Sequence, residues 1–403
     1  MRALSLGALE GDADAISGVQ VDSRVIEPGD LFVAVAGGEA FLEDALTRGA
    51  VATLVPDDPY AALAALGSAV RARSDARIVG ITGSVGKTST KDILAALLRP
   101  HRNTVAAPRG FNNEIGLPLT LCLIEPDTEV VVTEMAMRGA GQIRELAKIA
   151  KPHVGVITAI APVHLEQLGS LANIARAKAE LLEELEPGAV AVLPEDAAEL
   201  EPFVPDGLEV RRFAPPEAEV RDGRTHIGWH GRDVVFGFAA RHQATNAAAA
   251  LTAAAALGLE PPREPVDVAF SLWRSQEVEL PGGGLLLNDA WNANPVAMRA
   301  ALAHLLERAN GRRTVAILGE MAELGPEARR YHEEIARQAE SVDVVLGVGE
   351  HARHYAPDEW VATAVEAIAV VRDLVQPGDA ILVKGSRSVG LEVVADALLE
   401  GRA

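Results

Sequence analysis

A glycine-rich segment with one lysine carries the strongest chemical signal in this sequence. Gly80–Ser89, which reads Gly-Ile-Thr-Gly-Ser-Val-Gly-Lys-Thr-Ser, follows an apolar strand-like run and opens a helical one. Glycines let backbone N–H groups approach phosphate oxygens, and the N-terminus of a helix adds partial positive charge. Lys87 would then reach the β- and γ-phosphates of a nucleotide, and the hydroxyl of Thr88 would hold Mg²⁺. The spacing departs from the usual phosphate loop, because Ile81 stands where a glycine is expected, and an unliganded strand–helix turn is the alternative.

An acid and a histidine follow two further apolar strands. Glu134 ends the run Val130–Thr133, and His164 lies four residues beyond the run Val154–Ile160. In parallel α/β sheets, ligand sites form at the carboxyl ends of the strands, so both side chains are expected on the edge that holds the phosphate loop. One oxygen ligand and one imidazole near a nucleotide suit Mg²⁺ or Mn²⁺. Taken singly, each also fits a structural position, a solvated acid at a strand end and a hydrogen-bonded loop histidine.

Lys178 stands on the apolar side of a predicted helix. Apolar residues recur around it at helical spacing, at Leu171, Ile174, Leu181 and Leu185. A charged amine there costs free energy unless it is paired or its head reaches solvent past its own helix, which is the alternative. Burial lowers the pKa of a lysine and makes the neutral amine chemically available. Lys178 is therefore a candidate catalytic residue.

Further candidate ligand-binding residues lie in polar segments that end a strand or begin a helix. They are Ser23, Arg24, Asn112, Asn113, Asn246, Asp289, Asn292 and Asn294. Loops rich in such groups commonly bind ligands. Surface turns and helix caps use the same residue types, and Pro295 at the start of a helix explains part of the pattern around Asn294. The loop Lys384–Arg387, which follows another strand, is ambiguous in the same way.

Composition limits the class of protein. The 403 residues carry 57 acidic against 37 basic side chains, a formal charge of −20, which excludes a general nucleic-acid binder. Only six of the basic residues are lysines, so a lysine within a motif stands out. The single cysteine, Cys122, is expected to be a buried, inert thiol. No run approaches the roughly 18–20 apolar residues of a membrane span, and the first ten residues lack the shape of a signal peptide. We expect a cytoplasmic enzyme.

Alternating strands and helices predict an α/β protein. The expected strands are Leu31–Ala36, Ile78–Thr82, Val130–Thr133, Val154–Ile160, Ala189–Leu193, Leu285–Leu287, Thr314–Leu318, Val344–Val348 and Ala380–Lys384. The expected helices include Tyr60–Ala72, Thr88–Leu98 and Ala247–Leu257. The Pro-rich stretch Glu195–Asp222 is expected to be irregular or to hold short strands. At roughly 100–200 residues per domain the chain holds two to four domains, and we place three, at 1–76, 77–270 and 271–403.

Together these motifs resemble the Mur ligase family over nearly the whole chain. The segments that carry the resemblance are Thr82–Thr90, Phe111–Pro118, Glu134–Met135, Ala175–Glu180, Asn292–Pro295 and Gly319–Gly325. The resemblance implies a central parallel-sheet ATPase domain with a P-loop. A small N-terminal α/β domain for a UDP substrate and a C-terminal Rossmann-like α/β domain for an incoming dipeptide would flank it. The asparagine-rich loops are similar to those of the branch that joins D-alanyl-D-alanine to UDP-N-acetylmuramoyl-tripeptide with ATP, through an acyl phosphate, in peptidoglycan precursor synthesis.

The resemblance also implies a role for each matching residue. The ATP-binding set would be Gly83, Ser84, Val85, Gly86, Lys87, Thr88, Ser89, Asn246, Arg274 and Asp289. The Mg²⁺ set would be Thr88, Glu134, His164 and Lys178, in which Lys178 matches a lysine that this family carbamylates to make a carboxylate. The catalytic set would be Lys87, Glu134, His164 and Lys178. The substrate-binding set would be Ser23, Arg24, Asn112, Asn113, Asn292 and Asn294.

Some positions depart from the family pattern. Trp273 stands where the family has a glycine, and Trp291 stands where it has a tyrosine. We expect a monomer that binds these small molecules and neither nucleic acid nor a membrane. The alternatives are another Mur-type or folylpolyglutamate-type amide ligase, and a P-loop nucleotide-binding protein without ligase activity.

Overall fold

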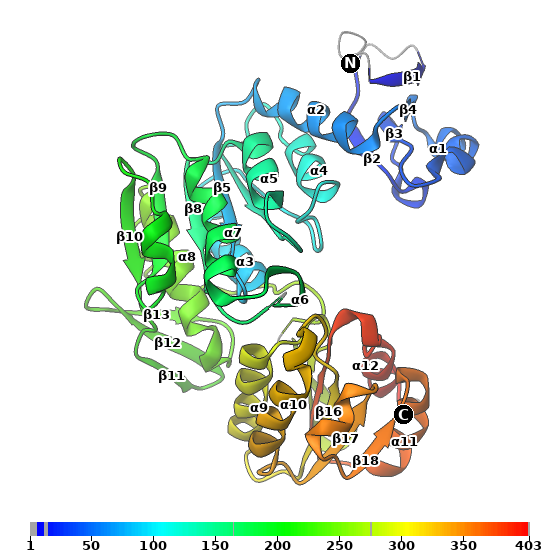
Figure 1. The fold of residues 1–403 in the computed structure, drawn as a ribbon, viewed down its shortest axis with the longest axis vertical. Coiled ribbons are helices and arrows are strands. Elements are labelled where there is room, and N and C mark those ends of the chain that lie inside the picture. The colour runs from blue at the N-terminus through cyan, green and yellow to red at the C-terminus, as the bar shows by residue number, and fades with distance from the viewer. Residues whose placement is uncertain (1–5, 12–14, 164, 275, 402–403) are drawn as a thin grey trace.

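A computed structural model describes residues 6–11, 15–163, 165–274 and 276–401. Its elements form three lobes that follow one another along the longest axis in chain order, with strand β1 at one end and helix α11 near the other (Figure 1). The main sheets are largely parallel and carry helices, so the predicted α/β class is confirmed. Among the helices of the described ranges, none combines the length and the apolar character that a membrane crossing needs.

The N-terminal lobe is a small sheet with the order β1-β4-β3-β2, in which β1 is antiparallel and the other pairs are parallel. Its elements are β1 (Gly7–Glu10), β2 (Gly18–Gln20), β3 (Asp30–Val33), α1 (Leu42–Arg48), β4 (Ala52–Pro56) and α2 (Pro59–Arg71). Helix α2 packs on the next lobe, where a Cβ on Gly67 would lie 2.9 Å from the Cα of Pro118. Leu63 and Leu66 share one apolar core with Leu119 of that lobe.

The central lobe is a six-stranded parallel sheet with the order β10-β9-β8-β5-β7-β6. Its strands are β5 (Arg77–Thr82), β6 (Thr104–Ala106), β7 (Val130–Glu134), β8 (Val154–Ile157), β9 (Val190–Pro194) and β10 (Glu209–Phe213). Its helices are α3 (Lys87–Leu98), α4 (Gly116–Cys122), α5 (Gln142–Ala150), α6 (Leu165–Leu168), α7 (Leu171–Glu183) and α8 (Ala244–Ala256). Alternate residues of β5 face opposite ways, so Val79 and Ile81 pack under α3 and α8 while Ile78 packs under α5 and α7.

A three-stranded antiparallel sheet is attached to the central lobe. Its strands are β11 (Ala218–Arg221), β12 (Arg224–Trp229) and β13 (Arg232–Phe236). Ile227, Val234 and Phe236 point into the core beneath α8. The Pro-rich stretch 195–222 holds one 3₁₀ segment and two short strands, one of the two expected forms. The other two strands of this sheet were missed, although Asp222 and Gly223, with φ angles of +51° and +73°, form an Asp-Gly turn that is a recognised hairpin signal.

The C-terminal lobe is a second six-stranded sheet, with the order β14-β15-β19-β16-β17-β18 and only β14 antiparallel. Its strands are β14 (Gln276–Leu280), β15 (Gly284–Asp289), β16 (Thr314–Gly319), β17 (Val344–Val348), β18 (Glu359–Val361) and β19 (Ala380–Lys384). Helices α9 (Pro295–Ala309) and α10 (Ala328–Ala339) cover one face, and α11 (Ala364–Leu374) and α12 (Glu392–Leu399) cover the other.

Short 3₁₀ segments join these elements. They are η2 (Ser23–Val25), η3 (Gly38–Phe41), η4 (Ala198–Phe203), η5 (Arg241–Gln243), η6 (Pro281–Gly283), η7 (Gly325–Glu327), η8 (His351–Tyr355) and η9 (Arg387–Val389). The central and C-terminal lobes meet at α6, which lies beside the C-terminal lobe in Figure 1. There a Cβ on Gly325 would lie 3.3 Å from Glu166. The domain boundaries at 76/77 and 270/271 remain a prediction.

Candidate active site

The glycine-rich segment forms a tight turn between β5 and α3. Gly83 and Gly86 have φ angles of +147° and +84°, a region that glycine adopts far more readily than other residues. A Cβ on Gly83 would lie 1.9 Å from Oγ1 of Thr158, and a Cβ on Gly86 would lie 2.1 Å from Oδ1 of Asn246. Both glycines are therefore required by close contacts as well as by backbone conformation.

The loop after β8 holds this turn from the neighbouring strand. The backbone N of Ser84 donates to the Ala159 carbonyl at 2.8 Å, and Ser84 Oγ donates to the Ala161 carbonyl at 3.0 Å. Thr158 Oγ1 donates to the Val85 carbonyl at 2.5 Å. The segment that leads toward position 164 is thus bonded directly to the phosphate loop. His164 itself lies outside the described residues.

Lys87 lies at the centre of the charged groups. Its Nζ donates to the Gly83 carbonyl at 2.8 Å. Burial lowers the pKa of Lys87, an effect that the carboxylate of Glu134 opposes and the guanidinium of Arg274 reinforces. Thr88 follows it in the first turn of α3 and is buried. The lysine therefore lies within electrostatic range of an acid of the central sheet and of an arginine from the start of the C-terminal lobe.

Glu134 ends β7 beside the phosphate loop and is 4% exposed. Asn112 Nδ2 donates to Glu134 Oε1 at 2.9 Å, so the structure joins two residues that the sequence pattern predicted separately. Asn113 behaves differently, since its Oδ1 accepts from the backbone N atoms of Ile115 and Gly116 at 3.3 and 3.0 Å. Its side-chain oxygen therefore accepts hydrogen bonds from the backbone N–H groups at the start of α4.

Lys178 is 2% exposed, so the alternative that its head reaches solvent past its own helix is wrong. Within the described ranges it makes no hydrogen bond or ion pair. Burial, and secondarily repulsion from Lys87, holds the pKa of Lys178 well below its ordinary value. Two residues along α7, Glu180 accepts from the backbone N atoms of Gly141 and Arg144 at 2.6 and 3.1 Å and so satisfies the start of α5. Helix α7 thus carries two buried charged residues of different kinds: Glu180, which has structural hydrogen bonds, and Lys178, which has none among the described residues.

Asn246 faces the phosphate loop from α8. Its Nδ2 donates to Oε1 of Gln243 at 2.6 Å, and Gln243 Nε2 lies 3.2 Å from Nε2 of His242. Burial lowers the pKa of His242 to about 3, and the ring of His304 lies 4.8 Å away. No side-chain bond caps the start of α8, so the capping alternative for this segment does not hold.

The C-terminal lobe contributes residues from the carboxyl ends of two neighbouring strands. Asp289 ends β15 and lies opposite Lys384 of β19. Lys384 Nζ donates to Asp289 Oδ2 at 2.5 Å and to the Asn292 carbonyl at 2.9 Å. Asn294 is the N-cap of α9, because its Oδ1 accepts from the backbone N of Ala297 at 2.9 Å. The helix-cap alternative therefore explains the side-chain oxygen of Asn294.

A cavity of about 340 Å³ lies between the central and C-terminal lobes. The predicted residues that line it are Ser84, Val85, Gly86, Lys87, Thr88, Ser89, Asn246, Arg274, Asp289, Asn292 and Asn294. Burial lowers the pKa of Arg274, which the carboxylates of Asp289 and Glu134 oppose from the two sides. Its buried Nε has no hydrogen-bond partner among the described residues. The cavity thus brings a phosphate loop and an incompletely bonded guanidinium together.

Ser23 and Arg24 lie apart from this cavity, in the N-terminal lobe. Arg24 is exposed and binds Asp22, with Nε 2.9 Å from Oδ1. Hydrogen bonds from Arg24 lower the pKa of Asp22 to about 2. The surface turn, the alternative named for this segment, therefore describes Arg24, whereas Ser23 is buried. Cys122 is only partly buried, and burial raises the pKa of its thiol to about 12.

Sequence reasoning missed several residues around the cavity. Lys91 is 4% exposed and pairs with Asp92 at 2.7 Å. Trp273, Trp291 and Arg109 meet at the same lobe junction. The rarity of lysine could have pointed to Lys91 and Lys384, and the departures from the family pattern could have pointed to the two tryptophans.

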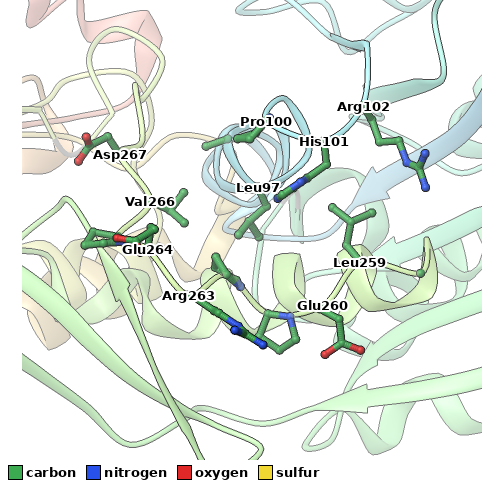
Figure 2. Close-up of a pocket in the computed structure, with 15 residues that line it drawn as sticks. Leu97, Pro100, His101, Arg102, Leu259, Glu260, Arg263, Glu264, Val266 and Asp267 are labelled. Carbon is green, nitrogen blue, oxygen red and sulfur yellow. The ribbon is translucent and has the colours of Figure 1, made fainter.

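A larger cavity, of about 770 Å³, lies elsewhere in the central lobe. Figure 2 shows it between the end of α3, at Leu97 and His101, and the segment that follows α8, at Glu260 and Arg263. Because α3 has 12 residues and rises about 1.5 Å per residue, this cavity lies about 18 Å from the phosphate loop at the other end of the helix. It is not part of the candidate active site.

Comparison with known proteins assigns the class. The Mur ligase middle domain matches residues 81–254, and the Mur ligase, glutamate ligase domain matches residues 273–387. The chain belongs to the Mur ligase family, and the predicted resemblance is confirmed.

Individual relatives carry a more particular name. The UDP-N-acetylmuramoyl-tripeptide–D-alanyl-D-alanine ligase of Mycobacterium leprae (strain TN) is 34% identical, over 94% of this chain and 92% of the relative. The crystal structure of MurF from Acinetobacter baumannii has a TM-score of 0.84 and 26% identity, covering 98% of this chain and 96% of that one. MurF ligase from Thermotoga maritima in complex with ADP has a TM-score of 0.81 and 28% identity, covering 96% and 98% of the two chains.

Proposed function

We propose that this chain is the ATP-dependent ligase that joins D-alanyl-D-alanine to UDP-N-acetylmuramoyl-tripeptide, a peptide-addition step of peptidoglycan precursor synthesis. The observation that carries the proposal is the cavity in which the phosphate loop of the central lobe faces Arg274 and Asp289. The match to a ligase of this name over more than nine tenths of both chains supports the choice of substrates. The reaction belongs to the cytoplasm, and the ligands are small molecules.

The phosphate loop would bind ATP. Backbone N–H groups of residues 83–89 and the N-terminus of α3 supply donors for the phosphate oxygens, and Lys87 supplies the fixed positive charge. Asn246 adds a polar group from α8 that touches the loop at Gly86. Arg274 and Asp289 reach the nucleotide from the C-terminal side, where Arg274 has a donor to spare.

The residues present fit a magnesium ion. Asn112 bonds Oε1 of Glu134, and Oε2 has no bond to any described residue, so one carboxylate oxygen is available. The described residues hold no cluster of three His, Cys, Asp or Glu side chains, which suits an ion that keeps water and phosphate oxygens among its ligands. Thr88, Glu134 and His164 would hold it. When bound, Mg²⁺ would neutralise charge on the transferred phosphoryl group.

Lys178 would act as a carbamate. Its neutral amine adds carbon dioxide, R–NH₂ + CO₂ → R–NH–COO⁻ + H⁺, forming one N–C bond and releasing one proton. The buried site without a partner favours the neutral amine that this addition needs. The resulting carboxylate would be attracted to Lys87, whereas the ammonium form of Lys178 is repelled by it. The carbamate would then add an oxygen ligand to the metal set.

The chemistry then follows from position and charge. The terminal carboxylate of the tripeptide attacks the γ-phosphorus of ATP, the bond to the bridging oxygen breaks, and ADP leaves an acyl phosphate. The dipeptide amine attacks the acyl carbon, and phosphate leaves as the amide forms. Lys87 and Arg274 stabilise negative charge on the phosphoryl oxygens, while the lobes hold the three reactants in line. Movement of the C-terminal lobe would control access to the cavity.

The remaining predicted residues would bind the other two substrates. Ser23 and Arg24 would contact the uridine nucleotide from the N-terminal lobe, and Asn112 and Asn113 would lie along the peptide. Asn292 and Asn294 line the cavity and would face the incoming dipeptide or the nucleotide. For Asn113 and Asn294 the available group is the side-chain NH₂, since the oxygen already accepts backbone bonds.

Phosphate release from ATP tests the proposal. Release should require both UDP-N-acetylmuramoyl-tripeptide and D-alanyl-D-alanine, and the product should contain the new amide. Release that the dipeptide does not affect would sink the assignment. Release that depends instead on a folate and glutamate would favour the folylpolyglutamate-type alternative, and binding of ATP without any substrate-dependent release would favour a non-catalytic protein.

A further inference from the structure

Two tryptophans and an arginine from three separate segments meet where the central and C-terminal lobes join. The Arg109 guanidinium carbon lies 4.0 Å from the ring centre of Trp273 and 4.5 Å from that of Trp291. The two ring centres are 6.0 Å apart. Arg387 approaches the same rings at 5.3 and 5.5 Å. We name Arg109, Trp273, Trp291 and Arg387 the indole–arginine cluster.

The cluster has an excess of positive charge. Arg387 forms an ion pair with Glu392. Arg109 is half-buried, yet within the described part of the chain it makes no hydrogen bond or ion pair. Arg274 adds a further guanidinium 6.0 Å from the ring of Trp291. Because a guanidinium has five N–H donors and binds carboxylates in a planar, two-bond geometry, the arrangement calls for an anion.

Short stretches of chain connect the cluster to the reaction site. Its members and their neighbours at the site are Trp273 with Arg274, Trp291 with Asn292, Arg387 with Lys384, and Arg109 with Asn112. No pair is more than three residues apart. The cluster therefore borders the cavity on the side that the C-terminal lobe provides.

A buried network holds the two sides of the cluster in place. Lys91 Nζ donates to the Ala107 carbonyl at 2.9 Å, and the neighbouring Asp92 accepts from the backbone N of Ser271 at 2.8 Å. These contacts anchor the chain two residues before Arg109 and two residues before Trp273. Trp273 itself has a φ of +62°, which costs free energy for a bulky residue and is kept where the surroundings enforce it. The position of Arg109 over the rings is thus built into the fold.

We propose that the indole–arginine cluster is the subsite for the C-terminal carboxylate of the incoming D-alanyl-D-alanine, with Arg109 as its anion-binding group. This inference rests on the proposed function and names a contact of its second substrate. Three of the four members belong to the segment after position 270, on the C-terminal side that would receive the dipeptide. Arg109 lacks a carboxylate that the dipeptide supplies, and the indole faces offer apolar surface to its methyl groups.

The length of the dipeptide sets how far its carboxylate lies from the reacting amine. Two residues in extended form span about 7 Å, so an amine at the acyl phosphate places the carboxylate one dipeptide length away from the phosphate loop. Arg274 connects the cluster to the phosphate loop, because its guanidinium carbon lies 6.0 Å from the ring centre of Trp291 and its charge also acts on Lys87. The guanidinium face that stacks on the rings stays fixed, while its N–H edge remains available for two parallel bonds.

The test compares D-alanyl-D-alanine with its C-terminal amide in steady-state phosphate release. In the wild-type protein the amide should raise KM for the dipeptide by about 10–100-fold, the effect of losing hydrogen bonds to a charged group. Arg109→Gln should raise KM for the acid by a similar factor, bring the acid and amide within about threefold of each other, and leave KM for ATP and for the UDP substrate within about twofold. Arg109→Lys keeps the charge without the planar guanidinium, so its KM for the acid should lie between those of the wild type and Arg109→Gln.

The matched control removes a comparable contact elsewhere. Arg353 lies 3.7 Å over the ring of Trp360 in the C-terminal lobe, outside the cavity, and Arg353→Gln should leave every KM unchanged. An unchanged dipeptide KM in both Arg109 variants would overturn the subsite, as would a rise in KM for the UDP substrate in place of the dipeptide. Wild-type protein that turns over acid and amide equally would overturn the subsite alone. Wild-type protein that releases no phosphate with either would overturn the proposed function together with it.

Discussion

Asn112 donates a hydrogen bond of 2.9 Å to Glu134 and so ties the loop before α4 to the carboxyl end of β7. The same bond occupies one oxygen of a buried carboxylate and leaves the other for a ligand. Removing a side chain that orients a metal-binding residue typically costs about 10–100-fold in metal affinity or activity. The pair therefore links two segments that the proposed function assigns to the peptide and to the metal.

Asn112→Ala should lower turnover by about 10–100-fold and raise the Mg²⁺ concentration needed for half-maximal activity. The free energy of unfolding should fall by only about 1 kcal/mol, since one hydrogen bond is lost. Phosphate release titrated with Mg²⁺, together with urea unfolding, measures both effects. A variant whose activity and Mg²⁺ dependence match the wild type would show that Glu134 needs no orienting partner.

Lys178→Met should abolish turnover without lowering the stability of the fold. The substitution removes an amine that has no partner among the described residues and keeps a side chain of similar length, so the unfolding midpoint should stay the same or rise. Turnover should be lost, and added short carboxylates should restore part of it with Lys178→Ala, which leaves space for them. Unchanged turnover in either variant would reject the role of Lys178.

Lys91→Met is the matched control for that substitution. Lys91 is as buried as Lys178 but pairs with Asp92 at 2.7 Å and donates to the Ala107 carbonyl. Removing it leaves a buried carboxylate without its cation, which should cost about 3–5 kcal/mol of unfolding free energy. Equal stability losses in the two methionine variants would contradict the distinction between a paired and an unpaired buried lysine.

Features set by residues close together in the sequence were predicted well, and features set by contacts between distant segments were not. β17 and β19 begin and end as predicted, because both are short buried runs bounded by turn residues. β8 ends at Ile157 rather than Ile160, because the next residues leave the sheet to bond the phosphate loop through Thr158. Apolar pattern alone does not reveal where a tertiary contact ends a strand.

The site shows the same division. The phosphate loop is local in sequence, and its lysine and glycines were predicted. The Asn112–Glu134 bond and the approach of Arg274 depend on packing between segments 22 to about 140 residues apart, which no spacing rule reports. Asn113 and Asn294 show the converse, since the same residue type that binds ligands also closes helix ends, and only the structure shows which backbone N–H groups it meets.

His332 predicts how stability depends on pH. Its Nε2 accepts from the backbone N of Met321 at 3.0 Å, and burial lowers its pKa from 6.5 to about 4. The folded chain keeps this ring neutral while the unfolded chain binds a proton below pH 6.5. The contribution to stability is therefore complete above pH 6.5 and is lost as the pH falls to 4, by at most roughly 3 kcal/mol.

His332→Gln should reduce the difference in unfolding free energy between pH 7 and pH 5, measured by urea unfolding. His242, whose pKa burial lowers to about 3, acts in the same direction, so the variant should keep part of the slope. His101→Gln, at an exposed position, serves as the control and should match the wild type. A slope in His332→Gln equal to that of the wild type would refute the assignment to this ring.

Gly86→Ala tests the turn of the phosphate loop against a matched glycine. Gly86 and Gly188 have φ angles of +84° and +86°, so alanine carries the same backbone strain at both, about 1–2 kcal/mol. At Gly188 the added Cβ meets nothing within 4 Å, whereas at Gly86 it lies 2.1 Å from Oδ1 of Asn246 and must displace that side chain from the loop. Both variants should lose stability through the strain, and Gly86→Ala should lose more because of the collision. Calorimetric titration with ATP should show an affinity loss of about tenfold or more in Gly86→Ala alone. Adding Asn246→Ala to Gly86→Ala relieves the collision but not the strain, and should recover stability without restoring the contact. Equal ATP affinity in the two single variants would mean that Asn246 and Gly86 do not act together in binding the nucleotide.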